Sequence, residues 1–229
     1  MPLRCVVTAG PTYEPLDRVR RLTNFSTGRL GSTLAARLAE DGHEVVLFLG
    51  AMSVHRAIFP SNCHVLEYST GADLARQLEA LSTQPVAAVF HAAAVSDFTF
   101  GKIWMRNRDG GLEEVAAGKV SSEEGVLHAE LLPTPKILGR LRGWFPESLV
   151  VGWKYEVDGN RSSAIEKGRQ QIAANRTDGC AVNGPAFGDG FGLLPQRGET
   201  RFLTDSGQLC ALLSKWVLTF DPPSRSREG

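Results

Sequence analysis

The stretch Thr8-Ala9-Gly10-Pro11-Thr12 directly follows a β-like apolar run at residues 3–7. After it comes Asn24-Phe25-Ser26-Thr27-Gly28-Arg29-Leu30-Gly31, which leads into a helix-like run at residues 31–39. The order strand, loop, helix places this segment at the carboxyl end of a first strand, where open α/β sheets bind ligands. Gly10 and Pro11 predict a tight turn that keeps bulky side chains away from a ligand. We therefore expect Gly10, Pro11 and Thr12 to belong to a nucleotide or phosphate site.

The start of the following helix strengthens this prediction. Ser26 and Thr27 are candidate N-caps, and a helix start offers free N–H groups and a partial positive charge that attract anions. We expect Ser26, Thr27 and Gly28 to contact a phosphate. The alternative is a strand–turn–helix connection with an ordinary cap, but loops longer than about twelve residues in compact domains tend to be functional or disordered.

Strand-like and helix-like runs alternate along the chain. The β-like runs lie at residues 3–8, 44–49, 86–92, 149–155 and 179–182, the helix-like runs near 31–39, 72–81, 135–144 and 163–174, and a last strand and helix at 200–203 and 208–218. This alternation predicts an α/β fold, a Rossmann-like, doubly wound and mostly parallel sheet covered on both faces. We expect one domain over residues 1–221, interrupted by an excursion at about 101–132, and a disordered polar tail at 222–229.

The composition argues against several classes of protein. The 25 Lys and Arg residues balance the 25 Asp and Glu residues, so no overall positive field would hold a polyanion and we expect no nucleic acid partner. No run approaches the roughly 18 to 20 apolar residues that a bilayer span needs, and no secretory leader is recognisable, so we expect no membrane partner and a cytoplasmic location. The four cysteines and five histidines lack the spacing of metal ligands, which argues against a structural zinc.

Further motifs follow the opening one in a fixed order. They are Ala92-Ala93-Ala94-Val95-Ser96-Asp97-Phe98, Gly118-Lys119-Val120-Ser121-Ser122, Leu132-Pro133-Thr134-Pro135-Lys136-Ile137, Val151-Gly152-Trp153-Lys154 and Asp178-Gly179-Cys180-Ala181-Val182-Asn183. The ordered set resembles the phosphopantothenoylcysteine synthetase family, also called phosphopantothenate–cysteine ligase, of coenzyme A biosynthesis. The resemblance implies a ligase that activates 4′-phosphopantothenate as an acyl-nucleotide with CTP or ATP and Mg²⁺, and then condenses it with cysteine. It also implies a homodimer in which the excursion forms an arm close to the neighbouring subunit's site.

The resemblance also assigns roles to individual residues. Asn24 matches the family's asparagine that binds the acyl-nucleotide and supports its conversion, although an Asx turn before the helix would also explain it. Lys119 matches a lysine brought to the triphosphate by a mobile segment, and the alternative is an exposed arm lysine. Arg20 matches an arginine of the substrate site, where a guanidinium suits a phosphate or carboxylate, and the alternative is a surface ion pair.

The remaining candidates follow later strands and are expected around the nucleotide. They are Ala93, Ala94, Val95 and Asp97 after the third strand, Trp153 and Lys154 at the end of the fourth, and Asp178 and Asn183 around the fifth. Asp97 is expected to hold Mg²⁺ or ribose, or else to cap the next turn. Trp153 replaces the family's usual phenylalanine and is expected to stack on the base. The loop at residues 187–192 either covers the nucleotide or is a mobile turn.

Some alternatives stay open at this stage. Ser121 and Ser122 stand where the commonest bacterial enzymes have lysines, so the choice between CTP and ATP is undecided. No flavin is expected, because the chain starts directly at the synthetase motif. A Rossmann NAD(P) oxidoreductase would need a G-x-G-x-x-G after the first strand, which is absent. A non-catalytic nucleotide-binding protein on the same scaffold would bind CTP or ATP without releasing pyrophosphate.

Overall fold

The computed structural model describes residues 2–55, 57–107, 109–115 and 125–221. Its centre is an eight-stranded sheet in the order β13-β12-β11-β10-β6-β1-β4-β5. The parallel strands are β1 (Arg4–Ala9), β4 (Glu44–Gly50), β5 (Cys63–Tyr68), β6 (Ala88–His91), β10 (Leu149–Tyr155) and β11 (Gly179–Asn183). Two antiparallel strands, β12 (Phe191–Pro195) and β13 (Arg201–Leu203), complete one edge.

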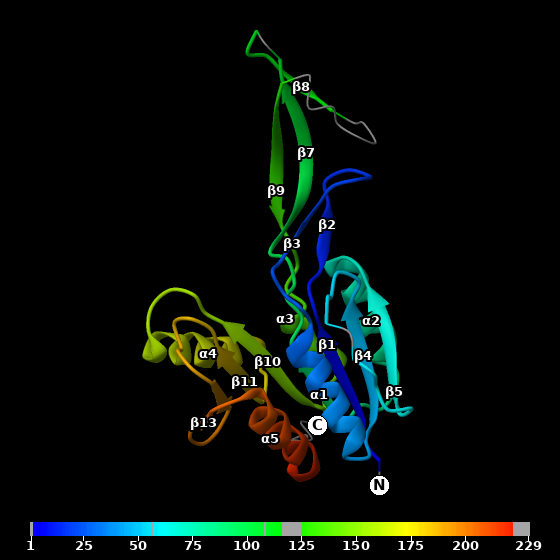
Figure 1. Ribbon diagram of the computed structural model, residues 1–229, viewed down its shortest axis with the longest axis vertical. Helices are drawn as coiled ribbons and strands as arrows, with labels where there is room; N and C mark the ends of the chain where they lie inside the picture. The colour runs from blue at the N-terminus through cyan, green and yellow to red at the C-terminus, as the bar shows by residue number, and fades with distance from the viewer. Residues whose placement is uncertain (1, 56, 108, 116–124, 222–229) are drawn as a thin grey trace, which may run out of the picture.

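Helices cover both faces of this sheet (Figure 1). They are α1 (Arg29–Glu40), α2 (Gly71–Leu81), α3 (Leu138–Trp144), α4 (Arg161–Asn175) and α5 (Ser206–Thr219). Because side chains alternate along a strand, Val7 packs in the core with α1 and α5, whereas Val6 packs with α2 and α3. A third cluster joins α4 to β11 and β12. The expected Rossmann-like, doubly wound fold is therefore confirmed.

Two strands of the central sheet, β5 and β12, were not predicted. The middle of β5, from His64 to Glu67, is exposed at the sheet edge, so it lacks the apolar run that marks a buried strand. Residues 187–190 form a turn, one of the two alternatives for this segment, and Phe191 begins β12. Phe187 is 2% exposed in the cluster beneath α4, so tertiary packing holds the start of this turn.

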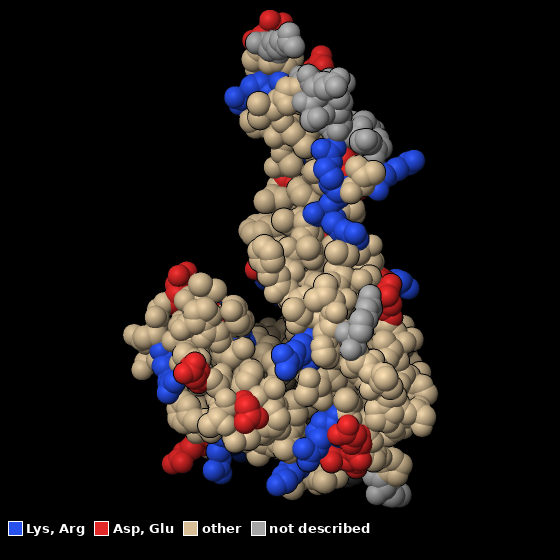
Figure 2. Space-filling view, viewed as in Figure 1, with Lys and Arg blue, Asp and Glu red and all other residues tan. Residues whose placement is uncertain are grey.

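The excursion is a protruding antiparallel sheet. It consists of β7 (Phe98–Arg106), β8 (Leu112–Glu114) and β9 (Val126–Pro133), and it stands well away from the central sheet (Figure 1). We call this sheet the arm. A short hairpin, β2 (Tyr13–Pro15) and β3 (Arg21–Thr23), lies beside its base. Figure 2 shows the surface hollowed between the base of the arm and the lobe that carries α4. The predicted tail at 222–229 lies outside the described residues.

Candidate functional site

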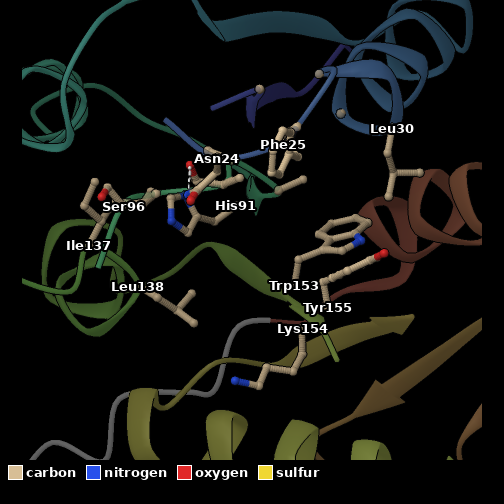
Figure 3. Close-up of a pocket in the computed structure, with 18 of the residues that line it drawn as sticks. Asn24, Phe25, Leu30, His91, Ser96, Ile137, Leu138, Trp153, Lys154 and Tyr155 are labelled. Carbon is tan, nitrogen blue, oxygen red and sulfur yellow. Dashed lines mark hydrogen bonds between the residues drawn. The ribbon is translucent and has the colours of Figure 1, made fainter. Parts of the chain in front are cut away.

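A pocket opens at the carboxyl edge of the parallel strands. Its volume is about 920 Å³, at the upper end of the range for small-molecule sites. Most of the candidate residues line it: Gly10, Asn24, Ser26, Thr27, Gly28, Ala93, Ala94, Val95, Asp97, Trp153, Lys154 and Asn183. Figure 3 shows Asn24, His91 and Ile137 on one side of the pocket, with Leu30 and Trp153 on the other. Segments far apart in the sequence thus meet where the sequence places a ligand.

The ends of β1 and β6 form the floor of this pocket. Beyond the two strands, Ala94 N–H donates to Gly10 O at 2.9 Å and Thr12 N–H donates to Ala94 O at 3.1 Å. Thr12 is fully buried, and its Oγ1 accepts a hydrogen bond from Ser96 N–H at 2.9 Å. Pro11 and Thr12 are not among the pocket-lining residues. The structure therefore gives them a supporting position behind the floor instead of the ligand contact expected from the sequence.

The start of α1 forms a second wall, and it is built differently from the prediction. Gly28 is the N-cap residue, with φ of 78°, and the cap has no side-chain hydrogen bond. The predicted N-cap position, Ser26 or Thr27, was therefore wrong, because the left-handed conformation that the chain needs here favours glycine. The side chain of Thr27 still contacts the first turn, since its Oγ1 accepts from Arg29 N–H at 3.3 Å. A Cβ on Gly28 would also lie 2.7 Å from Ser53 Oγ, and one on Gly10 only 1.9 Å from the same atom. The first-turn N–H groups of α1 remain without intrahelical partners and give this wall a positive potential.

Asn24 is held in one orientation beside the floor. Its Nδ2 donates to Ala94 O at 3.0 Å, which leaves Oδ1 and a second N–H for a ligand (Figure 3). An amide fixed in this way can donate and accept at the same time without losing further side-chain freedom when a ligand binds. Phe25, the next residue, is fully exposed at the pocket mouth.

His91 is a pocket residue that the sequence analysis did not select. It ends β6, is 7% exposed, and shares a 2.8 Å hydrogen bond between Nδ1 and Thr8 Oγ1. Burial lowers the pKa of His91 to about 4, so its ring is neutral near pH 7. Histidines were considered only as metal ligands, yet a polar residue closing the apolar run Ala88-Val89-Phe90 was a signal for the ligand edge of the sheet.

Charged groups at the pocket form ion pairs. Asp97 pairs with Lys136, and both side chains are mainly exposed. Lys154 Nζ lies 3.1 Å from Glu156 Oε1. Among the described residues no group of three or more potential ligands could hold a metal ion by itself. Mg²⁺ that arrives with nucleotide phosphates needs only one or two protein carboxylates, so Asp97 fits that smaller requirement.

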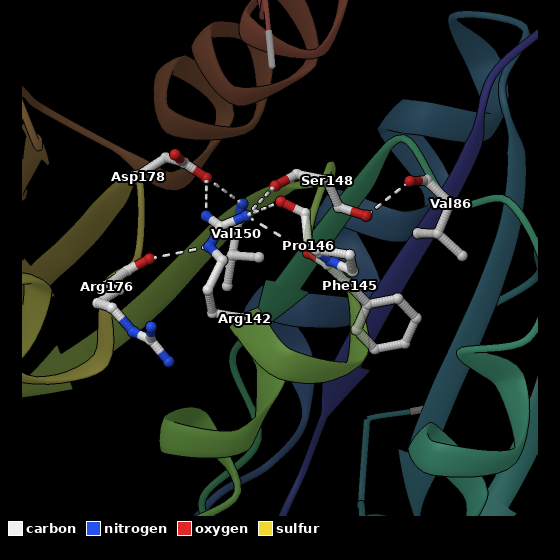
Figure 4. Close-up of polar contacts among 8 residues, drawn as sticks. All are labelled: Val86, Arg142, Phe145, Pro146, Ser148, Val150, Arg176 and Asp178. Atoms are coloured by element: carbon white, nitrogen blue, oxygen red, sulfur yellow. Dashed lines mark hydrogen bonds and ion pairs between the residues drawn. The ribbon is translucent and has the colours of Figure 1, made fainter. Parts of the chain in front are cut away.

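Two further candidates do not line the pocket, and a third is not described by the structure. Asp178 precedes β11 at the amino edge of the sheet, where its Oδ2 accepts from Arg142 Nη2 at 2.5 Å and from Val150 N–H at 2.7 Å (Figure 4). Its assignment to the nucleotide is corrected to a structural position. Arg20 lies between β2 and β3, and its Nη2 donates to Asp17 Oδ2 at 2.6 Å. Lys119 lies outside the described residues.

A family model and curated relatives match the sequence of this chain. The family model described as DNA/pantothenate metabolism flavoprotein C-terminal domain matches residues 2–212. The coenzyme A biosynthesis bifunctional protein CoaBC of Thermococcus kodakarensis is 33% identical over 181 residues, which are 79% of this chain and 41% of that protein. The chain therefore spans about two fifths of the length of such curated relatives.

Solved structures show the same fold. The DNA/pantothenate metabolism flavoprotein of Streptococcus pneumoniae aligns with a TM-score of 0.82 and 24% identity, over 96% of this chain and 100% of that one. A Cab2 mutant, H337A, solved in complex with phosphopantothenate-cysteine, aligns with a TM-score of 0.68 and 17% identity, over 95% of this chain and 88% of that one. At these identities the likeness concerns the fold alone. No helix in the described part of the chain is long and apolar enough to cross a membrane.

Proposed function

The chain belongs to the DNA/pantothenate metabolism flavoprotein C-terminal domain family, and on that premise we propose that it is a phosphopantothenate–cysteine ligase. In the first step, a carboxylate oxygen of 4′-phosphopantothenate attacks the α-phosphorus of CTP or ATP, and pyrophosphate leaves. In the second step, the amine of cysteine attacks the acyl carbon and the nucleoside monophosphate leaves. The product of this step is 4′-phosphopantothenoylcysteine. The observation that carries the proposal is the fixed amide of Asn24 between the α1 N-terminus and the β6 strand end.

The pocket offers a distinct wall for each part of the reactants. The positive end of α1, with Ser26, Thr27 and Gly28, suits the phosphates. The small side chains of Ala93 and Ala94 let a ligand approach the floor closely. Holding two reactants in place in this way removes much of the entropic barrier to their reaction.

The opposite wall suits the base of the nucleotide. Trp153 presents an indole that can stack on a base, and the Asn183 amide can read a base edge because it both donates and accepts. Lys154 adds a positive charge to the same wall, shared with Glu156. This wall accepts either cytosine or adenine in principle, so the proposal covers CTP and ATP.

Mg²⁺ is part of the proposal as a companion of the nucleotide. Asp97 would hold it, and Lys136, which now pairs with Asp97, would then be released toward the phosphates. When bound, the ion neutralises charge on the transferring phosphoryl group. Lys119 is proposed to approach the triphosphate and Arg20 to bind a substrate phosphate or carboxylate, both by family resemblance.

We also propose a homodimer formed through the arm. The arm exposes large apolar side chains on an extended surface, among them Phe98, Leu112, Val126, Leu131 and Leu132. Large exposed apolar side chains that gather on one protruding element are typical of an interaction site. A second copy of the chain would cover it and would bring its own arm toward the neighbouring pocket.

The test measures pyrophosphate release with phosphopantothenate, supplying CTP and ATP in separate reactions, and then product formation after addition of cysteine. The proposal expects pyrophosphate before cysteine is added and phosphopantothenoylcysteine only afterwards. Nucleotide binding without pyrophosphate release would contradict it and would favour a non-catalytic binding protein. Light scattering tests the dimer, and a monomer at the enzyme concentrations of the assay would contradict that part alone.

A further inference from the structure

The floor of the pocket has few free hydrogen-bond donors. Ala92 N–H donates to the carbonyl oxygen of Thr8 at 3.1 Å. Ala93 N–H donates to the side-chain Oγ1 of the same residue at 3.2 Å. Ala94 N–H donates to Gly10 O at 2.9 Å. The backbone of the β6 end therefore cannot supply the N–H pair that commonly binds an oxyanion in acyl transfer. A side-chain donor at this floor can therefore serve a ligand oxygen that Ala92, Ala93 and Ala94 cannot.

The contacts of Thr8 determine which nitrogen of His91 carries the proton. Thr8 Oγ1 already accepts the N–H of Ala93, and its own proton has one acceptor nearby, Nδ1 of His91 at 2.8 Å. A buried hydroxyl that donates to Nδ1 requires this nitrogen to be unprotonated, so the neutral ring carries its hydrogen on Nε2. The hydrogen-bond arrangement of these two buried side chains thus favours the Nε2–H tautomer, because it gives the Thr8 proton an acceptor.

The remaining nitrogen of His91 is available to a ligand. His91 is only 7% exposed, and its side chain lines the pocket beside Asn24 (Figure 3). Within the described part of the chain, Nε2 has no hydrogen-bond partner. Nε2 is not one of the fully buried side-chain atoms that lack a partner, so solvent reaches it from the pocket and a ligand that enters can contact it.

We propose that the Nε2–H of His91 donates a hydrogen bond to the acyl oxygen of the bound acid, and that His91 acts as a neutral oxyanion-stabilising catalytic residue. This inference rests on the proposed ligase function. When the cysteine nitrogen forms its bond to the acyl carbon, the carbonyl π pair moves to the oxygen, and Nε2–H stabilises the charge that develops there. Collapse of this intermediate breaks the bond to the phosphate oxygen, which leaves with its electron pair, and the amine proton passes to solvent. Nε2 keeps its own proton throughout.

A neutral donor suits both half-reactions. A positively charged imidazolium would hold the starting carboxylate strongly and weaken its attack on phosphorus, whereas a neutral N–H binds the carboxylate only moderately. Its hydrogen bond becomes stronger as the oxygen gains charge in the second step, and only such a differential interaction accelerates a reaction. Because the ring of His91 is buried, it stays neutral over the physiological pH range.

The decisive experiment is a single-turnover assay in which acyl-nucleotide is first accumulated without cysteine and cysteine is then added. We expect His91→Leu to slow amide formation by about 10²-fold, the usual effect of removing one oxyanion donor. His91→Gln, which restores an amide donor, should recover most of the rate. His43→Gln is the matched control, because His43 is equally buried (2% exposed) but lies in the turn between α1 and β4, and its rate should equal that of the wild type.

A second measurement does not depend on turnover. ¹⁵N NMR of the histidine rings should show His91 as the neutral Nε2–H tautomer at pH 7, and the Nε2 proton should move downfield when phosphopantothenoylcysteine is bound. Thr8→Val removes the group that fixes the tautomer, and this variant should show a mixture of the two neutral forms.

Separate outcomes would overturn the inference and the proposed function. A wild-type rate in His91→Leu, or an Nδ1–H tautomer, overturns the role of His91 while leaving the ligase in place. An acidic limb in the pH–rate profile that His91→Gln abolishes would make His91 a general base and would also overturn it. Asp97 and Lys136 line the pocket of both proteins, so only the difference between the two profiles is read. If the wild type forms no acyl-nucleotide, the proposed function fails and the inference fails with it.

Discussion

Replacement of Arg142 by methionine tests the structural position assigned to Asp178. Arg142 in α3 donates to the carbonyl oxygens of Phe145, Ser148 and Arg176, at 3.3, 2.8 and 3.0 Å, as well as to the Asp178 carboxylate (Figure 4). The two charged side chains are each 14% exposed. One guanidinium thus ties the end of α3 to the start of β10 and to the segment before β11.

The expected loss follows from what remains after the substitution. Methionine keeps much of the aliphatic volume of Arg142 but leaves the Asp178 carboxylate with only the Val150 N–H at 2.7 Å. Removing one partner of a buried ion pair costs about 3–5 kcal/mol, and the partial exposure of this pair favours the lower end, about 3 kcal/mol. With a urea m-value of roughly 3 kcal/mol/M for a chain of this size, the unfolding midpoint should fall by about 1 M.

Asp178→Asn is the companion variant and separates the two interpretations of Asp178. It keeps an oxygen that can accept from Val150 N–H, so we expect a loss of about 1–2 kcal/mol in the free energy of unfolding and unchanged affinity for CTP or ATP. The measurements are urea unfolding followed by tryptophan fluorescence, and nucleotide titration under native conditions. A loss below 1 kcal/mol in Arg142→Met would refute the stability argument. Lost nucleotide affinity in a folded Asp178→Asn protein would return Asp178 to the binding site.

Three further predictions concern the pocket. Asn24→Asp should leave pyrophosphate release intact but slow amide formation, so acyl-nucleotide should accumulate in quenched samples; unchanged turnover would argue against the role of Asn24. Lys119→Gln should suppress pyrophosphate release while the unfolding midpoint stays within error of the wild type, and normal release would make Lys119 a solvent-exposed arm residue. For His91, burial lowers the folded-state pKa to about 4 from 6.5. Because the unfolded chain binds the proton first, the contribution of His91 should be fully present above pH 6.5 and fall toward pH 4, by roughly 3 kcal/mol. His91→Leu should lose this contribution, whereas the contribution of His43, whose pKa burial also lowers, should remain.

The central sheet could be predicted because its strands are apolar runs. Buried parallel strands such as β1 and β10 carry almost no polar side chains, so composition alone marks them. The edge strand β5 could not be found in this way, since its outward residues are exposed and a strand at an edge needs only one covered side. Local patterns predict what a segment buries, and β5 buries little.

Errors at the site arose where tertiary structure decides the outcome. Ser26 and Thr27 have the composition of N-caps, yet the turn into α1 requires a left-handed residue and Gly28 provides it. Asp178 directly precedes the five-residue strand β11 and Asn183 ends it, so the two lie at opposite edges of the sheet. Strand direction, which a motif does not encode, decides which end of the motif meets the ligand.

The position of the pocket follows from the strand order itself. The chain leaves β1 toward α1 on one face of the sheet, and it leaves β6 toward α3 on the other face, so the two connections diverge and open a crevice between neighbouring strands. The arm is inserted into the second connection, between β6 and α3. Its base closes on itself, because Phe98 pairs with Pro133 and Thr134 N–H donates to Asp97 O at 3.0 Å. The chain therefore enters and leaves the arm at the same point on the pocket rim. For this reason a long arm can be inserted without changing the crevice between β1 and β6.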